Sequence, residues 1–373
     1  MDFTLTDEQK ALSELAGQIF TDHGALDRLK AIERNDEGFD PEAWSALAKT
    51  GLLGAALSEE AGGIGGGFVE ACLLLEQQGK RVVSVPLLQT VVAGAMPIAR
   101  FGTRAQRERW LPGILAGEAV LTAALTELAT PDPRSPVTVA KRAPSGWRLS
   151  GVKVGVPFAE RADAIVVPAR TDDGRVAVFL VERGARGMTM AREQTMNWEP
   201  DARVDLADVD VGPDAVLGSI DSGADVLAWI VDHVTVGLCA IATGVCQEAL
   251  RITAEYASNR KQFDKPIAMF QAVGQRMADG YIDNEAVSLT MWQAATRLAD
   301  DMPSDAEIAT AKFWAAEAGS RIGHTGLHIH GGISIDVDYP IHRYFLWAKQ
   351  IEYTLGGATP QLVRLGGLIA GAA

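Results

Sequence analysis

One stretch of the chain, YASNRKQFDKPIAMFQ, places an arginine, two phenylalanines and a glutamine around a break between two helical patterns. Pro266 ends the first pattern, because proline has no amide donor and restricts the residue before it. Arg260 and Phe263 therefore lie at a helix end, and Phe270 and Gln271 open the next helix. A guanidinium pairs well with phosphate oxygens, and aromatic rings stack on flat ligands. The stretch predicts a grip on an extended ligand that carries a diphosphate and a flat ring.

The charge and composition exclude some classes of partner. The 373 residues carry a formal net charge of −14, whereas binding to nucleic acid or to an anionic membrane needs a basic surface. The N-terminal MDFTLTDEQK has neither the basic n-region nor the apolar h-region of a secretory signal. No apolar run approaches the roughly 20 residues that span a bilayer. We therefore expect a cytoplasmic protein without a nucleic-acid partner or a membrane span.

The cysteines and histidines predict neither a disulfide nor a metal site. Cys72, Cys239 and Cys246 show no C-x-x-C pairing and are typical of small core residues in a reducing cytosol. His324 and His328 have the i,i+4 spacing of one helix face, on which two histidines could share a zinc ion. No carboxylate or thiolate accompanies them at helical spacing, so we expect no metal.

Three regions of different character predict a mixed α and β protein with three domains. Residues 1–120 are mostly helical in pattern and begin with a capping box, Thr6-x-x-Gln9. Residues 121–220 contain short alternating or β-branched runs between Gly, Pro and Asp turns, which indicates a small β-barrel or sandwich. Residues 221–373 return to long helices with apolar faces, which predicts a C-terminal four-helix bundle.

The order of these regions and several motifs together resemble the acyl-CoA dehydrogenases. The stretch that contains Arg260 is similar to the family's Y-x-x-x-R-x-x-F-G-x-P-I-x-x-F-Q element, which holds flavin dinucleotide. Further similarity lies at residues 101–112, 149–153, 330–332 and 339–340, so the resemblance covers nearly the whole chain. It implies FAD as the cofactor, an acyl-CoA substrate and α,β-dehydrogenation of the acyl thioester. It does not identify the acyl group.

The resemblance also assigns residues to the flavin site. Arg260 matches the arginine that meets the diphosphate, although a cation at a helix C-terminus could instead serve the helix dipole. Gly331 and Gly332 match a Q-x-x-G-G element that lets the backbone approach the pyrophosphate, which glycine permits because it has no Cβ. His330 beside them could simply cap a helix. The full set that the resemblance implies for FAD binding is Arg260, Phe263, Phe270, Gln271, His328, Gly331, Gly332 and Thr126.

Two departures from the family pattern affect the β region, the first in a loop that would help to hold CoA and the second at the face of the flavin ring. Thr126 begins a loop that resembles the family's T-E-P-G-A-G-S, but Leu128–Pro131 replaces P-G-A-G. Farther along, the family usually has K-x-W-I-T-N, in which the Trp shields a flavin face and the Thr bonds N5. Gly155 and Pro157 stand at those positions here, and a proline cannot donate even a backbone hydrogen bond. This chain alone would leave that flavin face poorly covered.

The catalytic base is missing from both positions where the family places it. Removal of the α-proton needs a glutamate near the thioester. Gly356 stands where the C-terminal loop would carry it, and Val234 stands at the alternative position on the first bundle helix. Glu352, His233 and Asp232 are nearby substitutes, although each could equally serve packing or the surface.

The combination resembles the glutamate-lacking subunits of actinobacterial heterotetrameric acyl-CoA dehydrogenases of the steroid side-chain type. The resemblance implies an α2β2 assembly in which this chain completes the flavin site of a glutamate-bearing partner subunit. Two alternatives stay open. One is a self-sufficient homodimer or homotetramer that uses Glu352 or His233 as its base, and the other is a non-catalytic scaffold subunit.

Overall fold

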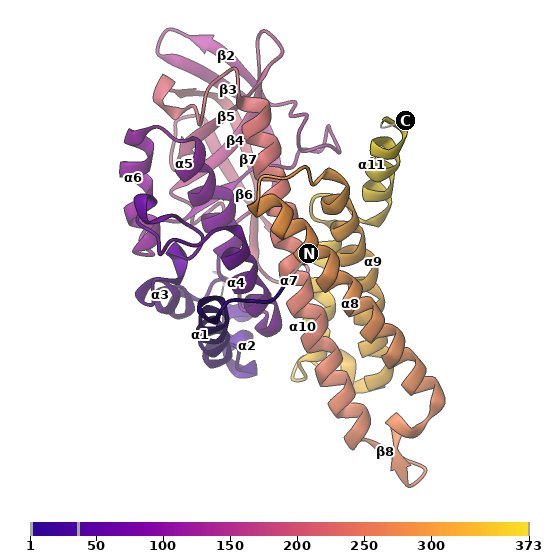
Figure 1. Ribbon diagram of the computed structural model, residues 1–373. Helices are drawn as coiled ribbons and strands as arrows, with labels where there is room; N and C mark the ends of the chain where they lie inside the picture. The colour runs from indigo at the N-terminus through magenta and orange to yellow at the C-terminus, as the bar shows by residue number, and fades with distance from the viewer. Residues whose placement is uncertain (1–2, 36–37, 372–373) are drawn as a thin grey trace. The chain divides into compact units, whose positions relative to one another are not determined.

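The computed structural model describes residues 3–35 and 38–371, which form helices, then a β-sheet, then helices again along the chain (Figure 1). They fall into two compact units, each built from more than one segment. The bundle unit comprises Met1–Arg34, Cys72–Val83 and Thr235–Ala373, and the sheet unit comprises Asn35–Ala71 and Ser84–Val234. The three domains with boundaries near residues 120 and 220 stay a prediction.

The first helix shows how the local sequence sets an element. Gln9 N donates a hydrogen bond to Thr6 Oγ1 at 3.2 Å, and Thr6 N donates to Gln9 Oε1 at 3.0 Å, so the predicted capping box is confirmed. The box satisfies amide groups that a helix start leaves unpaired.

The bundle unit is mostly helical. Helices that lie in it or extend into it are α1 (Asp7–His23), α2 (Leu26–Arg34), α4 (Phe68–Arg81), α7 (Gly223–Asn259), α8 (Gln271–Ala299), α9 (Asp305–His330), α10 (Ile341–Tyr353) and α11 (Ala358–Gly371). Shorter elements there are the hairpin strands β8 (Lys261–Gln262) and β9 (Lys265–Pro266) and the 3-10 turns η5 (Ile267–Met269) and η6 (Gly331–Ile335).

Helix α7 is 37 residues long, and by length and composition it could cross a membrane. The sequence-based statement that no apolar run is that long is therefore wrong for α7. A helix that is apolar on all sides is either a buried core helix or a membrane span. Here 83% of its most apolar window is buried inside the protein, as in the core helix of a globular domain.

Two glycines let α4 and α7 pack backbone to backbone in the bundle unit. A Cβ on Gly244 would lie 2.0 Å from Glu76 O, and a Cβ on Gly79 would lie 2.1 Å from Ile241 O. Neither position could hold a side chain unless the two helices moved apart. This contact joins a segment from the N-terminal third of the chain to the bundle.

The sheet unit combines short helices with a seven-stranded mixed sheet of order β1-β4-β2-β3-β7-β6, in which β5 also pairs with β4. Strands β1 and β2 run parallel to β4, and the remaining pairs are antiparallel. The strands are β1 (Leu121–Ala123), β2 (Val139–Ala143), β3 (Gly146–Pro157), β4 (Ala164–Thr171), β5 (Val176–Glu182), β6 (Met188–Gln194) and β7 (Pro200–Val211). The helices are α3 (Pro41–Lys49), α5 (Met96–Phe101), α6 (Arg104–Leu115), the π-helix η3 (Leu88–Ala95) and the turns η1 (Leu52–Gly54), η2 (Glu59–Ala61) and η4 (Pro213–Ala215).

Inward-facing side chains of the long strands form the core of the sheet unit. The ring of Trp147 lies edge to face with Phe179, with 5.8 Å between centroids. The register of the β3–β7 pair shifts between Lys153 and Val156, so β3 bulges at Gly155. The order of helical region, sheet and helical bundle confirms the mixed α and β class that the sequence predicts.

Candidate functional site

Arg260 directly follows the last residue of α7 and starts the connection to α8. Ile267 N donates to Arg260 O at 2.8 Å, which closes the β8–β9 hairpin at its base. The turn residues Phe263 and Asp264 have φ of 53° and 63°. Two consecutive positive φ angles are typical of a type I′ turn, which brings the strands of a two-residue hairpin together.

Aromatic and polar side chains gather around this hairpin. Phe263 is 87% exposed, and its ring lies edge to face with Phe270, with 6.2 Å between centroids. Lys265 Nζ lies 4.5 Å from the centroid of the Phe270 ring. Gln271 is exposed as the first residue of α8. The Arg260 side chain is also exposed and forms no ion pair within residues 3–35 and 38–371. The structure thus brings four of the sequence-predicted residues to one end of the bundle unit.

A tyrosine on α7 connects the hairpin to the end of α9. Tyr256 O accepts the hydrogen bond of Arg260 N at 2.8 Å, and the Tyr256 ring stacks on His330 with 4.4 Å between centroids. The Tyr256 hydroxyl also donates to His330 O at 3.4 Å. Gly331 and Gly332 follow His330, so the structure places the glycine pair beside the hairpin. Gly331 has φ 64°, and a Cβ on either glycine would meet no atom within 4 Å, which leaves the backbone open to a ligand.

His330 contributes more to this end of the bundle unit than the helix cap that the sequence suggests. The residue is 4% exposed, its Nδ1 lies 2.8 Å from Gly326 O, and its buried Nε2 has no hydrogen-bond partner among the described residues. Burial lowers the pKa of His330, although the bond to Gly326 opposes this. The ring is therefore neutral at pH 7. The only sequence feature that marks His330 is its position before the glycine pair. His328, two residues earlier, is exposed.

Thr126 and Gly155 lie close together in the sheet unit. Thr126 O accepts a hydrogen bond from Val154 N at 3.1 Å, and the Thr126 side chain is exposed. Gly155 follows with φ 54°, a conformation that other residues rarely adopt. Its N–H donates to Glu193 Oε2 at 2.7 Å, and Pro157 has no N–H to donate. The surface that these residues form, the ring wall, has no aromatic ring at position 155 and no backbone hydrogen-bond donor at position 157.

A buried ion pair fixes the loop that follows Thr126. Lys153 is fully buried, and its Nζ donates to Glu127 Oε1 at 2.5 Å and to Pro168 O at 2.8 Å. Thr138 Oγ1 also donates to Glu127 at 2.7 Å. Burial lowers the pKa of Lys153 to about 8, although the charge of Glu127 opposes the shift. Burial alone would raise the pKa of Glu127, but Lys153 and the hydrogen bonds hold it below its usual value.

The loop after α10 holds no acid at position 356. Leu355 and Gly356 have φ of 56° and 90°, so both residues are in left-handed conformations. Gln361 Nε2 donates to Leu355 O at 3.1 Å and ties the loop to α11. Glu352 lies in the last turn of α10, where its carboxylate accepts a hydrogen bond from Lys349 Nζ at 2.8 Å. Glu352 is therefore part of an ion pair on α10 and lies outside the loop.

Packing side chains fill the alternative base position on α7. Val234 is 8% exposed, and its neighbour His233 is 2% exposed. The His233 ring stacks on Trp229 with 3.7 Å between centroids and meets Phe68 edge to face at 4.5 Å. Neither residue presents a base to solvent.

Asp232, the third nearby acid or base, pairs with Arg134 in the loop between β1 and β2. Each of the three side chains named as a possible base is thus in contact with other groups of the protein. Asp232 and Glu352 form ion pairs, and His233 is enclosed by aromatic rings.

Two family models match most of the chain. The acyl-CoA dehydrogenase N-terminal domain matches residues 6–118, and the acyl-CoA dehydrogenase C-terminal domain matches residues 221–362. The chain belongs to the acyl-CoA dehydrogenase family. As a member of that family, it is an FAD-dependent oxidoreductase, which confirms the enzyme class and the cofactor expected from the sequence.

Several relatives resemble this acyl-CoA dehydrogenase over its whole length. Acyl-CoA dehydrogenase FadE27 of Mycobacterium tuberculosis (strain ATCC 25618 / H37Rv) is 40% identical, with 98% of each chain covered. The structure of a Tcur3481-Tcur3483 steroid ACAD variant has a TM-score of 0.93 and 44% identity, with 99% of each chain covered. The ChsE4-ChsE5 complex from Mycobacterium tuberculosis has a TM-score of 0.94 and 40% identity, also with 99% of each chain covered. These similarities confirm the resemblance to steroid-type acyl-CoA dehydrogenases.

The described residues suit one part of FAD better than the other. At the end of the bundle unit, an exposed guanidinium, the ring pair of exposed Phe263 and half-buried Phe270, and an open glycine pair have the properties that a dinucleotide tail requires. In the sheet unit, Gly155 has a positive φ and its N–H donates to Glu193, and Pro157 has no N–H to donate. The chain therefore has neither an aromatic ring at position 155 nor a hydrogen-bond donor at position 157.

Proposed function

We propose that this acyl-CoA dehydrogenase chain is one subunit of a hetero-oligomer, and that a glutamate-bearing paralogue supplies the base for α,β-dehydrogenation. One observation carries the proposal: Gly356 and Val234 occupy both family positions of the base, and neither can take a proton. The solved ChsE4-ChsE5 complex and the Tcur3481-Tcur3483 steroid ACAD, each named for two chains, support a mixed assembly. The acyl group would belong to the steroid class that the name of the Tcur3481-Tcur3483 structure suggests.

In this proposal, the chain contributes residues that bind the dinucleotide part of FAD. Bound FAD supplies the chemistry by accepting the hydride that leaves the β-carbon of the acyl group. Arg260 binds the diphosphate, since its fork of donors matches phosphate oxygens. The glycine pair at 331–332 lets the backbone approach the same group. The residues that we assign to FAD are Arg260, Phe263, Phe270, Gln271, His328, Gly331, Gly332 and Thr126.

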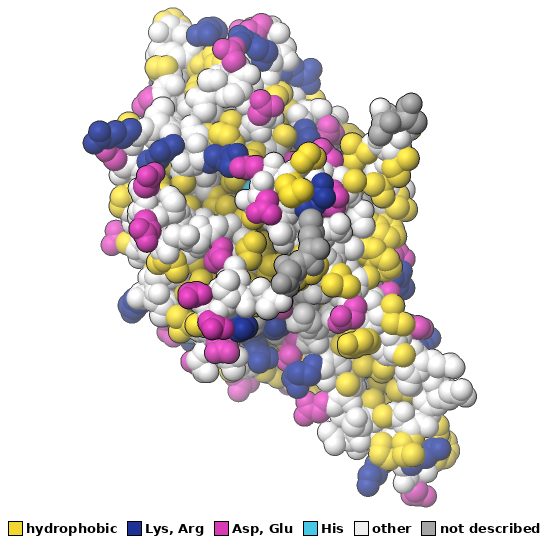
Figure 2. Space-filling model, viewed as in Figure 1, with side chains coloured by type: hydrophobic (Ala, Val, Ile, Leu, Met, Phe, Trp, Pro, Cys, Tyr) yellow, Lys and Arg dark blue, Asp and Glu magenta, His cyan; other side chains and the backbone are white. Residues whose placement is uncertain are grey.

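The surface of α8 supports an oligomer. Tyr281, Ile282 and Leu289 are 63%, 64% and 53% exposed, and Met269 just before the helix is 68% exposed. Figure 2 shows hydrophobic side chains along this part of the surface. Large apolar side chains that gather on a surface often mark a site of contact with another protein.

We place the assembly in the cytoplasm, because the three cysteines of this chain are buried and unpaired, as in a reducing compartment.

Co-expression with a glutamate-bearing paralogue tests the proposal. The purified pair is expected to dehydrogenate acyl-CoA, and this chain alone is expected to be inactive. Replacing the partner's glutamate with glutamine should abolish turnover. In this chain, Glu352→Gln and His233→Phe keep the side-chain shape and remove the titrating group, so the pair should retain its activity.

Other results would point elsewhere. A homomer of this chain that contains flavin, turns over acyl-CoA and loses turnover with Glu352→Gln or His233→Phe would show a displaced base. A chain that assembles with its partner, while the flavin content and activity of that partner do not depend on it, would show a scaffold subunit.

A further inference from the structure

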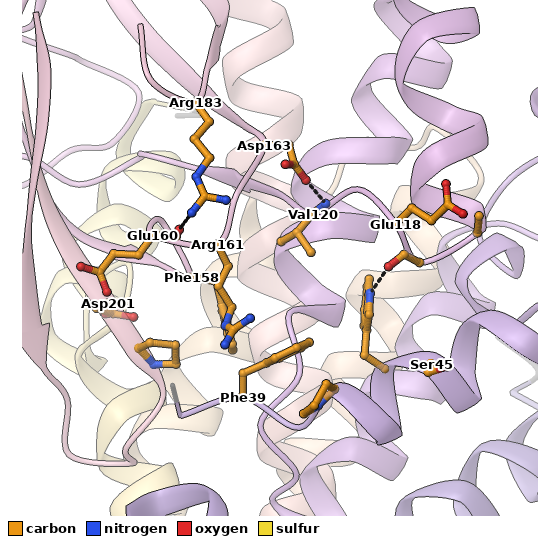
Figure 3. Close-up of a pocket in the computed structure, with 15 residues that line it drawn as sticks. Phe39, Ser45, Glu118, Val120, Phe158, Glu160, Arg161, Asp163, Arg183 and Asp201 are labelled. Carbon is orange, nitrogen blue, oxygen red and sulfur yellow. Dashed lines mark hydrogen bonds between the residues drawn. The ribbon is translucent and has the colours of Figure 1, made fainter. Parts of the chain in front are cut away.

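The sheet unit holds a cavity of about 600 Å³ that the proposed function does not use (Figure 3). A volume of this size is in the range of small-molecule sites, about 300–1,000 Å³. Its apolar wall consists of three almost fully buried rings, Phe39, Trp44 and Phe158. Phe39 and Phe158 meet edge to face with 6.4 Å between centroids, and Trp44 Nε1 donates to Gly117 O at 3.0 Å. Trp44 lies on α3, Phe39 lies two residues before α3, and Phe158 directly follows β3.

Charged groups line the rest of the cavity, and three of them have a defined side-chain contact. Asp163 accepts a hydrogen bond from Val120 N at 2.9 Å, and Arg183 donates to Glu160 O at 2.7 Å. The guanidinium of Arg161 lies 4.4 Å from the centroid of the Phe39 ring. The lining carboxylates are Glu118, Glu160, Asp163 and Asp201, and the lining guanidiniums are Arg161 and Arg183, so negative charge is in excess.

Asp201 differs from the other carboxylates. It is 8% exposed, it lines the cavity, and within residues 3–35 and 38–371 its carboxylate forms no ion pair and accepts no hydrogen bond. Burial raises its pKa to about 7, and the charge of Glu193 across the β6–β7 pair adds to the shift. A buried carboxylate without a partner is costly, and such groups are normally paired.

Backbone strain lies on the same wall of the cavity. Phe158 is fully buried and has φ 52°, and its N–H donates to Pro200 O at 2.6 Å. A bulky residue in the left-handed region persists only where its surroundings enforce the conformation, and such residues cluster at ligand sites. The strain and the unpaired acid are independent observations on one cavity.

We propose that this cavity binds a cationic group, a guanidinium or a primary ammonium on an aliphatic stem, whose charge pairs with Asp201. The rings of Phe39, Trp44 and Phe158 pack against the stem, as apolar walls do against the stems of basic side chains. The excess of carboxylates disfavours an anionic ligand. None of the residues that line the cavity is assigned to FAD, although Asp201 pairs across the strands with Pro157.

Calorimetric titration of the full chain, in whichever assembly it is purified, tests the proposal with agmatine as the probe. Saturable binding is expected for the wild type, and Asp201→Asn should weaken it about tenfold or more, because the amide has no charge to pair. Asp225→Asn, which removes an exposed acid at the start of α7, is the matched control and should leave binding unchanged. A thermal melt verifies that both variants are folded.

Two further titrations complete the test. Pentanol has a similar stem without the charge, so it should not compete with agmatine. An acetylated and amidated Gly-Arg-Gly peptide distinguishes the sources: tighter binding than agmatine indicates a basic side chain of a protein partner, and no binding indicates a small free amine. The proposal is overturned if agmatine does not bind the wild type, if Asp201→Asn binds it equally well, or if pentanol displaces it.

Discussion

Gly356 has a backbone conformation that a glutamate would adopt only with strain. Its φ is 90°, and a Cβ there would lie 3.3 Å from Gln361 Nε2 and 3.4 Å from Pro360 Cβ. Gly356→Glu therefore costs about 1–2 kcal/mol of unfolding free energy, measured by urea denaturation. Gly356→Ala has the same backbone cost without the acid and should lose a similar amount.

The same variant probes catalysis. Purified alone, the Gly356→Glu chain should stay inactive on acyl-CoA, because Gly155 and Pro157 still leave the ring wall incomplete. A Gly356→Glu homomer with flavin and steady turnover would mean that the loop alone separates this chain from a self-sufficient enzyme.

Lys153 and Glu127 form a charge pair that has no access to water. Lys153→Met leaves the carboxylate buried without its cation, so the unfolding free energy should fall by about 3–5 kcal/mol. Adding Glu127→Leu removes the stranded charge and should recover part of that loss, although Thr138 then also loses its acceptor. Urea unfolding of the three proteins measures this, and equal stability of Lys153→Met and the wild type would contradict the importance of the pair.

Asp201 should make the folded state less stable as the pH rises. Its folded pKa of about 7 lies above the ordinary value of an aspartate, so the folded state holds a proton that the unfolded state has already released. As the pH rises from the unfolded pKa to the folded pKa of Asp201, the free energy of unfolding therefore falls. Asp201→Asn should raise the unfolding free energy by about 1–4 kcal/mol at pH 8 and by less at pH 5. Asp225→Asn should show no such difference between the two pH values, and an equal gain at both for Asp201→Asn would contradict the shift.

The sequence located some of these residues and missed others for a physical reason. Arg260 and Phe263 were found because a proline-marked helix break is a local signal. No sequence pattern marks Asp201 as a site residue. Its burial depends on strand pairing with Pro157 on β3 and with Glu193 on β6, and the sequence alone does not show these pairs. The sequence leaves the role of His330 open, because its stacking on Tyr256 joins two helix ends that sequence spacing cannot relate.

At the scale of elements, the proposed function assigns dinucleotide binding to the β8–β9 hairpin. The sequence predicted the break between α7 and α8 but not the hairpin, because Phe263-Asp264 is not one of the Asn-Gly-like pairs that announce a type I′ turn. The tertiary setting between two long helices overrides that preference. The bulge at Gly155 was likewise visible only once β3 was paired with β7.

A substitution at Arg260 should change the binding of flavin without changing the stability of the protein. Arg260→Ala should lower the flavin affinity of the purified hetero-oligomer about tenfold or more, because charge-assisted bonds to phosphate are strong. The unfolding free energy should change by less than about 0.5 kcal/mol, because the side chain is exposed and forms no ion pair within residues 3–35 and 38–371. Arg276→Ala, at an exposed arginine on α8, is the matched control. Unchanged flavin affinity in Arg260→Ala would remove the hairpin from the site.

At the scale of the whole molecule, the sequence predicted the order of helices, sheet and bundle but not how the segments are shared. Residues Cys72–Val83 belong with the bundle unit, although they lie in the N-terminal helical region. The cause is the close approach of α4 to α7 at Gly79 and Gly244, and no local pattern marks two glycines that meet across this distance in sequence. The net charge of −14 fits a partner that is a protein and not a nucleic acid.

The flavin content of the purified assembly tests the central claim most directly. Flavin absorbance and protein mass are measured for the co-purified pair and for this chain alone. We predict one flavin for each pair of unlike subunits and little or none for this chain by itself. Two flavins for each pair, or a fully loaded homomer of this chain, would contradict a division of labour in which this subunit grips a cofactor that works beside the partner's glutamate.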